Sequence, residues 1–339
     1  MNETSSLHSC NEQIEIDYFR SEDAPGIARL IREVYGEAYP VSTYYFPELL
    51  IQENAAGGII SSVARTSEGE VVAHVALLLV DPSTHLYESV AGAVLPAFRG
   101  QRVFPRVFRH SIVEASKSFG VEGIIGEPVC SHVHTQKMCL QLGFRESGLE
   151  VDLLPAAADV MNTDPSGRVS VLLGYFIHKP RVQVVHIPPA YRDELQYLYR
   201  GLDVERTFLC SEVDVPVEGV SQGSMKLFDA AQVARSTIDC IGLDFGSFIS
   251  RLEGEAREKG MEIFQIWLPL ASPSAPGATD ILRGQGYFLG GVQPCWVKGD
   301  GLMMQKVSKK PNWEGIALYS ERARHIEEII RSDWKRVNG

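Results

Sequence analysis

The order in which strand-like and helix-like segments follow one another constrains the fold of this chain most. Between residues 14 and 180, a strand-like segment is followed by two helices, three strands, a helix, a strand, a short helix and two strands. That order predicts a mixed sheet with helices on both sides, an α/β or α+β layered domain. The predicted strands are 14–19, 59–67, 70–81, 88–96, 120–129, 149–155 and 169–178, and the predicted helices are 21–35, 46–58, 104–120 and 134–143.

Part of this pattern recurs in the second half of the chain. Residues 117–128 have a counterpart in 257–269, and residues 142–148 and 285–291 each contain a glycine, an aromatic residue and a second glycine five residues after the first. The period of about 140 residues is too long for a solenoid, so we interpret the matches as a diverged duplication, although chance can also produce two short matches. A length of 339 residues suits two domains. We predict a polar tail at 1–12, one domain at 13–180, and a second at 181–339 that ends in an amphipathic helix.

Composition excludes several classes of partner. The net charge of −11 argues against nucleic acid or an anionic membrane, because those partners require a broad basic field. No apolar run approaches 18 residues, and the N-terminal segment has no signal-like apolar core, so we expect neither a membrane span nor a secretory signal. The six cysteines are scattered without a C-x-x-C pair, which predicts reduced thiols in a cytoplasm rather than a zinc site or a disulfide framework.

Residues 95–109 form an arginine-rich segment between a predicted strand and a predicted helix. Gly100 lies in the turn, and the helix begins near Phe104. Backbone amides at a helix N-terminus bind anions readily, whereas cations placed there oppose the helix dipole, so a bound anion would offset an unfavourable arrangement. A solvated basic face is the alternative interpretation. No Asp or Glu lies between Glu88 and Glu114 to compensate the four arginines, which are Arg99, Arg102, Arg106 and Arg109.

The segment Arg99–Phe104 resembles the acyl-CoA-binding motif of the GNAT superfamily of N-acetyltransferases. That motif reads Gln or Arg, two variable residues, Gly, one variable residue, then Gly or Ala. The strand order of the first 180 residues and the pair Gly143–Phe144 after the last helix are also similar to that family. The resemblance implies that acetyl-CoA is the co-substrate, with loop amides on the pyrophosphate and pantetheine between two splayed parallel strands. The coenzyme-binding residues it implies are Val94, Leu95, Arg99, Gly100, Gln101, Arg102, Val103, Phe104, His132 and Gln136.

The sequence departs from the motif at two positions. Arg102 stands where the family has glycine, which is costly if the position requires a positive φ, although the amide can still donate and the guanidinium could pair with a phosphate. Phe104 stands at the final small position and could pack beneath the turn. In the second half, the segment Asp239–Asp244 occupies the equivalent place with two carboxylates, which would repel pyrophosphate. We therefore expect the second domain to be a copy of the fold that has lost coenzyme binding.

Acyl transfer to an amine needs a base and a proton donor. Glu127 ends the strand at 120–129 and is the candidate base; the alternative is a surface carboxylate. Cys139 stands where the family often has a tyrosine that acts as the acid, so it is the candidate proton donor; the alternative is a buried structural cysteine. Tyr44 and Tyr45 lie in the segment that lines the acceptor site in the family, where their rings could hold an amine by cation–π contact, unless they belong to the core. His132 replaces an asparagine that often contacts the coenzyme; it does not share a helix face with the nearby His134, so we expect no metal site.

The predicted function is transfer of an acetyl or other acyl group from acetyl-CoA to a primary amine, on a small molecule or a protein, in the cytoplasm. A homodimer is considered because the second domain could supply a dimer surface. The alternative is a non-catalytic acyl-CoA-binding sensor or interaction module of the same fold. A purely structural duplicate within a larger complex is a third interpretation.

Overall fold

The structure is a computed structural model that describes residues 13–37, 39, 41–156, 167–210, 214–216, 218–296 and 299–339. The predicted polar tail at 1–12 lies outside these residues. By packing, the chain divides into two compact units, and the predicted domain boundary near residue 180 stays a prediction. The first unit is Met1–Glu37, Val41–Leu77 and Val90–Ser116, and the second is Ala38–Pro40, Leu78–Ser89 and Lys117–Gly339.

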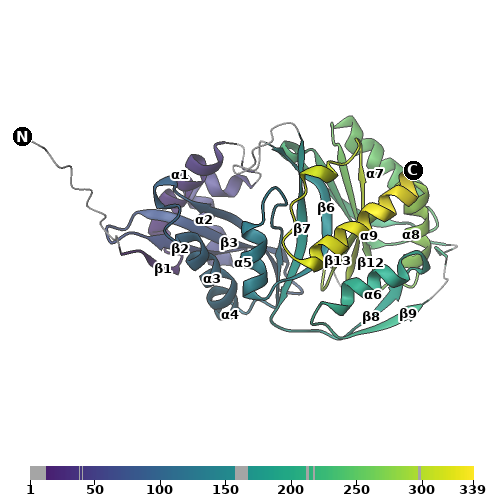
Figure 1. Cartoon of the computed structure of the whole chain (residues 1–339), viewed down its shortest axis with the longest axis horizontal. Coiled ribbons are helices and arrows are strands. Elements are labelled where there is room, and N and C mark those ends of the chain that lie inside the picture. The colour runs from purple at the N-terminus through teal and green to yellow at the C-terminus, as the bar shows by residue number, and fades with distance from the viewer. Residues whose placement is uncertain are drawn as a thin grey trace, which may run out of the picture. The chain divides into compact units, whose positions relative to one another are not determined.

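The first unit contains a sheet with the strand order β1-β2-β3-β4, and its helices pack beside it (Figure 1). Strands β3 and β4 contribute residues to both units. Every residue of β2 is buried, and α1 turns an apolar stripe inward, as its spacing of alanine, isoleucine and leucine predicts. The elements are β1 (Glu15–Tyr18), α1 (Ala24–Tyr35), α2 (Pro47–Ala56), β2 (Ile59–Arg65), β3 (Val71–Asp81), β4 (Leu86–Val94) and α3 (Val103–Arg109).

The helix predicted at 104–120 is present but not uniform. It begins as α3, continues as a π-helical stretch over His110–Ala115, and ends as the short α4 (Ser116–Ser118). Apolar periodicity predicts the helix but does not distinguish 3.6 residues per turn from the wider π turn.

The second unit contains a larger sheet with the order β4-β5-β7-β6-β13-β14-β12-β11-β10, and a separate parallel pair, β8-β9. Helices α6 and α9 contact β6 and β13, and Figure 1 shows both lying across this sheet. The elements are β5 (Gly123–Gly126), α5 (His134–Leu142), β6 (Arg145–Pro155), β7 (Arg168–Ile177), β8 (Gln183–Ile187), α6 (Arg192–Arg200), β9 (Arg206–Cys210), β10 (Gln222–Phe228), β11 (Val233–Cys240), α7 (Phe245–Glu258), β12 (Ile263–Pro269), α8 (Ala275–Gly284), β13 (Phe288–Gln293), β14 (Gly301–Val307) and α9 (Glu321–Asn338).

In the described residues, the element order from β8 to β14 follows that from β1 to β7, without counterparts to α2 and to the short α4 that ends the helix begun by α3. Within the large sheet, β4·β5 and β11·β12 are parallel pairs, and the second strand of each pairs antiparallel with β7 or β14. The second half also contains the separate parallel pair β8·β9, whereas β1 and β2 pair antiparallel. The β4·β5 pairing covers only Leu86–Glu88 against Gly123–Ile125, so β4 extends six residues beyond its last partner. The predicted fold class, a mixed and mostly antiparallel sheet with parallel central strands and flanking helices, is confirmed.

A pair of glycines from the two segments predicted to be repeated meets in the sheet. Gly148 of β6 pairs antiparallel with Gly291 of β13, and these are the second glycines of the two repeated segments. A Cβ added at Gly148 would lie 2.5 Å from the carbonyl oxygen of Gly290, so only glycine allows this approach. In the described residues, no helix has the length and apolarity needed to cross a membrane.

Candidate active site

The arginine-rich turn has the strand–turn–helix geometry that the sequence predicts. β4 ends at Val94, and the amide of Leu95 donates to the carbonyl of Val72 over 2.9 Å. Gly100 and Arg102 both adopt left-handed backbone conformations, with φ of 78° and 59°, and α3 begins at the next residue. Arg102 therefore adopts the conformation that favours glycine, at a cost of about 1 kcal/mol.

The four arginines of this segment fall into two groups. Arg106 donates to the carbonyl of Ile14 over 3.0 Å, and Arg109 lies 3.6 Å from a glutamate of the same helix. Arg99 and Arg102 are exposed, and within the described residues neither forms an ion pair. Their guanidinium groups remain accessible to an anion.

Phe104 packs against β4. Its ring lies 3.1 Å from the position that a Cβ at Gly92 would occupy, and it stacks on Phe108 with centroids 5.9 Å apart. The bulky residue at the motif's small position is accommodated because β4 has a glycine beside it. The ring consequently lies along the strand to which the resemblance assigns the pantetheine.

Gln136 and His132 have contacts of their own within the second unit. The Gln136 amide donates to the carbonyls of Val129 (3.1 Å), His132 (3.0 Å) and Ala317 (2.8 Å), and its oxygen accepts from the amide of Tyr319 (3.0 Å). This side chain is 2% exposed and connects α5 to the segment that precedes α9. Nδ1 of His132 accepts from the amide two residues ahead. Both polar atoms of the Gln136 side chain already form hydrogen bonds with backbone groups, so we do not include Gln136 in the proposed coenzyme site.

The two tyrosines predicted to line the acceptor site lie in the core of the first unit. Tyr44 is fully buried, with its ring edge-on to His74 at 5.7 Å. Tyr45 is 7% exposed; its hydroxyl donates to the carbonyl of Gly36 over 2.8 Å, and the guanidinium of Arg32 lies 5.3 Å from its ring centroid. A protein cation already occupies one face of that ring, so the predicted contact with an acceptor amine stays a prediction.

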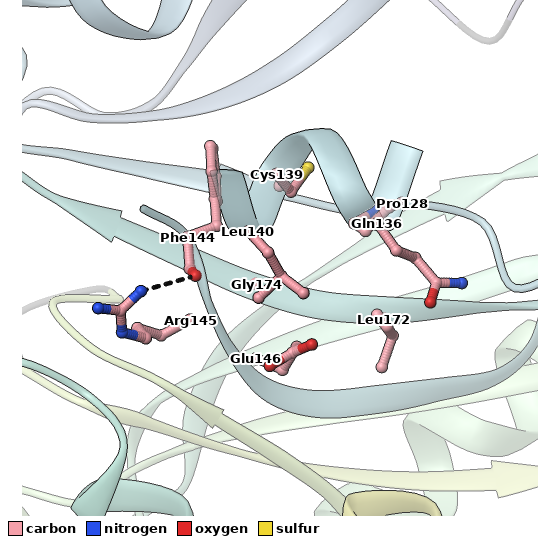
Figure 2. A pocket seen from close by; sticks show the side chains of 10 residues that line it. Pro128, Gln136, Cys139, Leu140, Phe144, Arg145, Glu146, Leu172 and Gly174 are labelled. Atoms are coloured by element: carbon pink, nitrogen blue, oxygen red, sulfur yellow. Dashed lines mark hydrogen bonds between the residues drawn. The ribbon is translucent and has the colours of Figure 1, made fainter. Parts of the chain in front are cut away.

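Cys139 lies on α5 and is 5% exposed. Burial raises the pKa of its thiol to about 12, so the thiol keeps its proton near neutral pH. Figure 2 shows the small cavity beside it, which Leu140, Phe144 and Leu172 also line. At about 10 Å³, the cavity has room for roughly one water molecule and none for a substrate.

Glu127 belongs to a cluster of charged side chains inside the second unit. Nη2 of Arg235, on β11, lies 3.6 Å from Oε1 of Glu127 and 2.9 Å from Oε1 of Glu150 on β6. The Arg235 Nε donates to Gln265 of β12 over 2.7 Å, and the Gln265 amide donates to the same oxygen of Glu150 over 2.7 Å. Glu88 of β4 interacts electrostatically with Glu127 and Arg235. We call Glu88, Glu127, Glu150 and Arg235 the glutamate cluster.

The environment of the glutamate cluster favours protonated carboxyl groups. Burial, and next the charge of Glu127, raise the pKa of both Glu88 and Glu150 to about 8, while Arg235 opposes the rise. The second oxygen of Glu150 is buried and has no hydrogen-bond partner among the described residues. Glu127 is 18% exposed, and Glu88 is partly exposed. Glu88 can therefore exchange a proton near neutral pH at a place that solvent reaches.

Sequence reasoning found Glu127 and missed the rest of the cluster. Its members lie up to 147 residues apart along the chain, from Glu88 to Arg235, and only the fold brings them together. One local signal was present: Gln265 interrupts the apolar run at 263–268, and a polar residue inside a buried strand indicates a polar partner. Arg235, in a strand bounded by valine, alanine and isoleucine, carries the same signal.

The equivalent turn in the second half connects β11 to α7, as its position in the repeat predicts. The turn carries two carboxylates, those of Asp239 and Asp244. Asp244 accepts a hydrogen bond from the backbone amide of Ser221 over 2.7 Å, so this carboxylate stabilises the turn itself. Gly242 allows close backbone approach, because an added Cβ would lie 2.6 Å from Val220. The turn contains no arginine.

Comparison with known proteins finds likeness in structure only. No protein-family model matches the chain, and no curated protein matches it. A ribosomal-protein-S5-alanine acetyltransferase from Vibrio fischeri is similar at 15% identity, over 49% of this chain and 93% of that one, with a TM-score of 0.39. Spermidine N-acetyltransferase from Vibrio cholerae, in complex with CoA and spermine, is similar at 14% identity, over 49% and 95%, with a TM-score of 0.38. These likenesses cover half of this chain and do not decide its activity.

Proposed function

We propose that the chain is an acyltransferase that moves an acetyl or other acyl group from acetyl-CoA to a primary amine. The observation that carries the proposal is the glutamate cluster, because acyl transfer to an amine needs a base and the cluster gathers carboxyl groups at the parallel strands. Glu88 forms the last registered pair of the parallel strands, with Ile125, and Glu127 follows two residues later. The resemblance to the GNAT superfamily assigns the thioester to the place where these two strands separate.

In this proposal, the amine nitrogen attacks the thioester carbonyl, and the carbon–sulfur bond breaks in the resulting tetrahedral intermediate. Glu127, directly or through water, accepts the proton that the amine loses. That proton then passes to the departing thiolate, directly or through water, so that coenzyme A leaves as a thiol and Glu127 is a carboxylate again. The turn at Arg99–Phe104 and the strand end at Val94 and Leu95 would hold the coenzyme. The second half is a duplicated copy without coenzyme binding. The cytoplasmic location and the homodimer stay predictions.

The test measures release of coenzyme A thiol from acetyl-CoA, with and without a panel of primary amines. The parent should release thiol only when an amine is present, and Glu127→Gln should lower kcat/KM about 100-fold or more, the usual contribution of a general base. Glu262→Gln is the control, because Glu262 pairs with the exposed Lys309 outside the cluster.

A second candidate function is acyl-CoA binding without catalysis. Two observations favour it: Phe104 lies against the strand assigned to the pantetheine, and Cys139 is buried at the position of the family's acid. Binding of acetyl-CoA with no thiol release for any amine would favour this candidate. Indifference to acetyl-CoA in both assays would contradict both.

A further inference from the structure

Arg235 occupies the position in the second half that Glu88 occupies in the first. Glu88 is the third residue of β4 and pairs with Ile125; Arg235 is the third residue of β11 and pairs with Gln265. Ile125 and Gln265 align in the repeated segments 117–128 and 257–269. Equivalent places in the two halves therefore carry opposite charges, and both side chains belong to one cluster.

Arg235 contacts both halves of the chain, and its ion pairs go to the first half. Its side chain is 14% exposed, and its guanidinium reaches Glu150 at 2.9 Å and Glu127 at 3.6 Å. Gln265 orients it from the neighbouring strand, accepting from Nε at 2.7 Å. Its guanidinium also lies 5.6 Å from the ring centroid of Phe228 on β10. Arg235 is thus fixed by its own half while its charge faces carboxylates of the other.

The charge balance makes this guanidinium important. Three carboxyl groups face it: Glu88 from β4, Glu127 after β5 and Glu150 from β6. A second cation that acts on Glu88 is Lys226 of β10. Carboxyl groups that lose a nearby cation in a buried setting take up protons, and a protonated carboxyl cannot act as a base.

We propose that Arg235 is a positioning residue through which the second half of the chain holds the glutamate cluster in place and favours the ionised form of its carboxyl groups. Its relevance to catalysis rests on the proposed acyltransferase function. Its effect on the carboxyl groups does not, because that effect exists in the protein without coenzyme or amine. The second half is then more than a scaffold, since it supplies a charge on which the glutamates of the first half depend.

The test is a pH titration of the glutamate carboxyl carbons by NMR in the intact, ligand-free protein, with signals assigned from Glu88→Gln and Glu150→Gln. In Arg235→Gln, Glu88 and Glu150 should titrate at least about one pH unit higher than in the parent. Arg235→Lys, which keeps the charge, should recover most of that shift. Arg257→Gln is the control, because it removes an arginine paired with Glu253 away from the cluster.

A purely structural role would lower the melting temperature and leave the titration unchanged. Unchanged titration of Glu88 and Glu150 in a folded Arg235→Gln protein would overturn the proposal. If that variant does not fold, Glu150→Gln is compared with Glu150→Gln/Arg235→Gln, in which neither member of the buried ion pair is left alone. Glu88 should titrate higher in the double variant, and equal titration would also overturn the proposal.

An acyltransferase should show the same shift in the rising limb of its kcat/KM against pH for Arg235→Gln. If the chain has no acyltransferase activity, the proposed function fails while the NMR titration still decides what Arg235 does to the carboxyl groups. The two failures are therefore distinguishable.

Discussion

Replacing Glu88 by glutamine should change the pH dependence of stability. The folded protein raises the pKa of Glu88 from 4.5 to about 8, first through burial and next through the charge of Glu127. A carboxyl group with a raised folded-state pKa favours the folded state fully below its unfolded pKa, and this stability is lost as the pH rises toward 8. Each pH unit in that interval corresponds to about 1.4 kcal/mol.

From pH 5.5 to 7.5 the parent should therefore lose about 3 kcal/mol of unfolding free energy relative to Glu88→Gln, which cannot ionise. Urea denaturation followed by circular dichroism at pH 5.5, 6.5 and 7.5 measures this difference. Glu122→Gln is the control: a hydrogen bond from Lys179, together with Arg181, lowers the pKa of Glu122, so this carboxyl group is ionised throughout that range. A parent-to-variant difference that stays constant from pH 5.5 to 7.5 would refute the reasoning.

Three further predictions concern single residues. Gly148→Ala should destabilise the protein by about 3 kcal/mol, because the new Cβ meets backbone atoms. Gly254→Ala, where nothing lies within 4 Å, should stabilise α7 by up to about 1 kcal/mol. Equal effects of the two substitutions in urea denaturation would contradict the close approach of Gly148 and Gly291. Arg102→Gly should be about 1 kcal/mol more stable than Arg102→Ala, because the position is left-handed, and the reverse order would mean that this conformation is not adopted. Cys139→Ala should lower the melting temperature and leave kcat for acetyl transfer within about threefold, whereas a loss above tenfold in a folded variant would establish the thiol as the acid.

The sequence predicted the features that depend on neighbouring residues. The order of strands and helices along the chain follows from local apolar patterns. The turn at 95–103 and the equivalent turn after β11 follow from their glycines and from the helix that comes next. The repeat was visible as two short matches, and the second match contained Gly148 and Gly291, which meet in the fold. Their pairing could not be predicted, because a match in sequence does not say that the matched segments touch.

The site was harder to predict, because its chemistry depends on burial and on distant partners. Glu127 was identified from its place at a strand end, but its arginine lies 108 residues later along the chain. Gln136 and Tyr45 were assigned to ligands by position alone, and their side chains contact the protein's own backbone. A polar group pairs with the nearest complementary group in the fold, and one sequence does not show which group that is.

The most direct test of the account is isothermal titration of acetyl-CoA into the parent and into Arg99→Glu/Arg102→Glu. Arg29→Glu/Arg109→Glu, which changes the net charge equally, is the control. We expect the parent and the control to bind, and the affinity to fall by about 100-fold or more when both exposed arginines of the turn are reversed, since charged hydrogen bonds contribute about 1.5–3 kcal/mol each. Equal affinity in all three proteins, or no binding by the parent, would contradict the central claim that this turn holds the coenzyme.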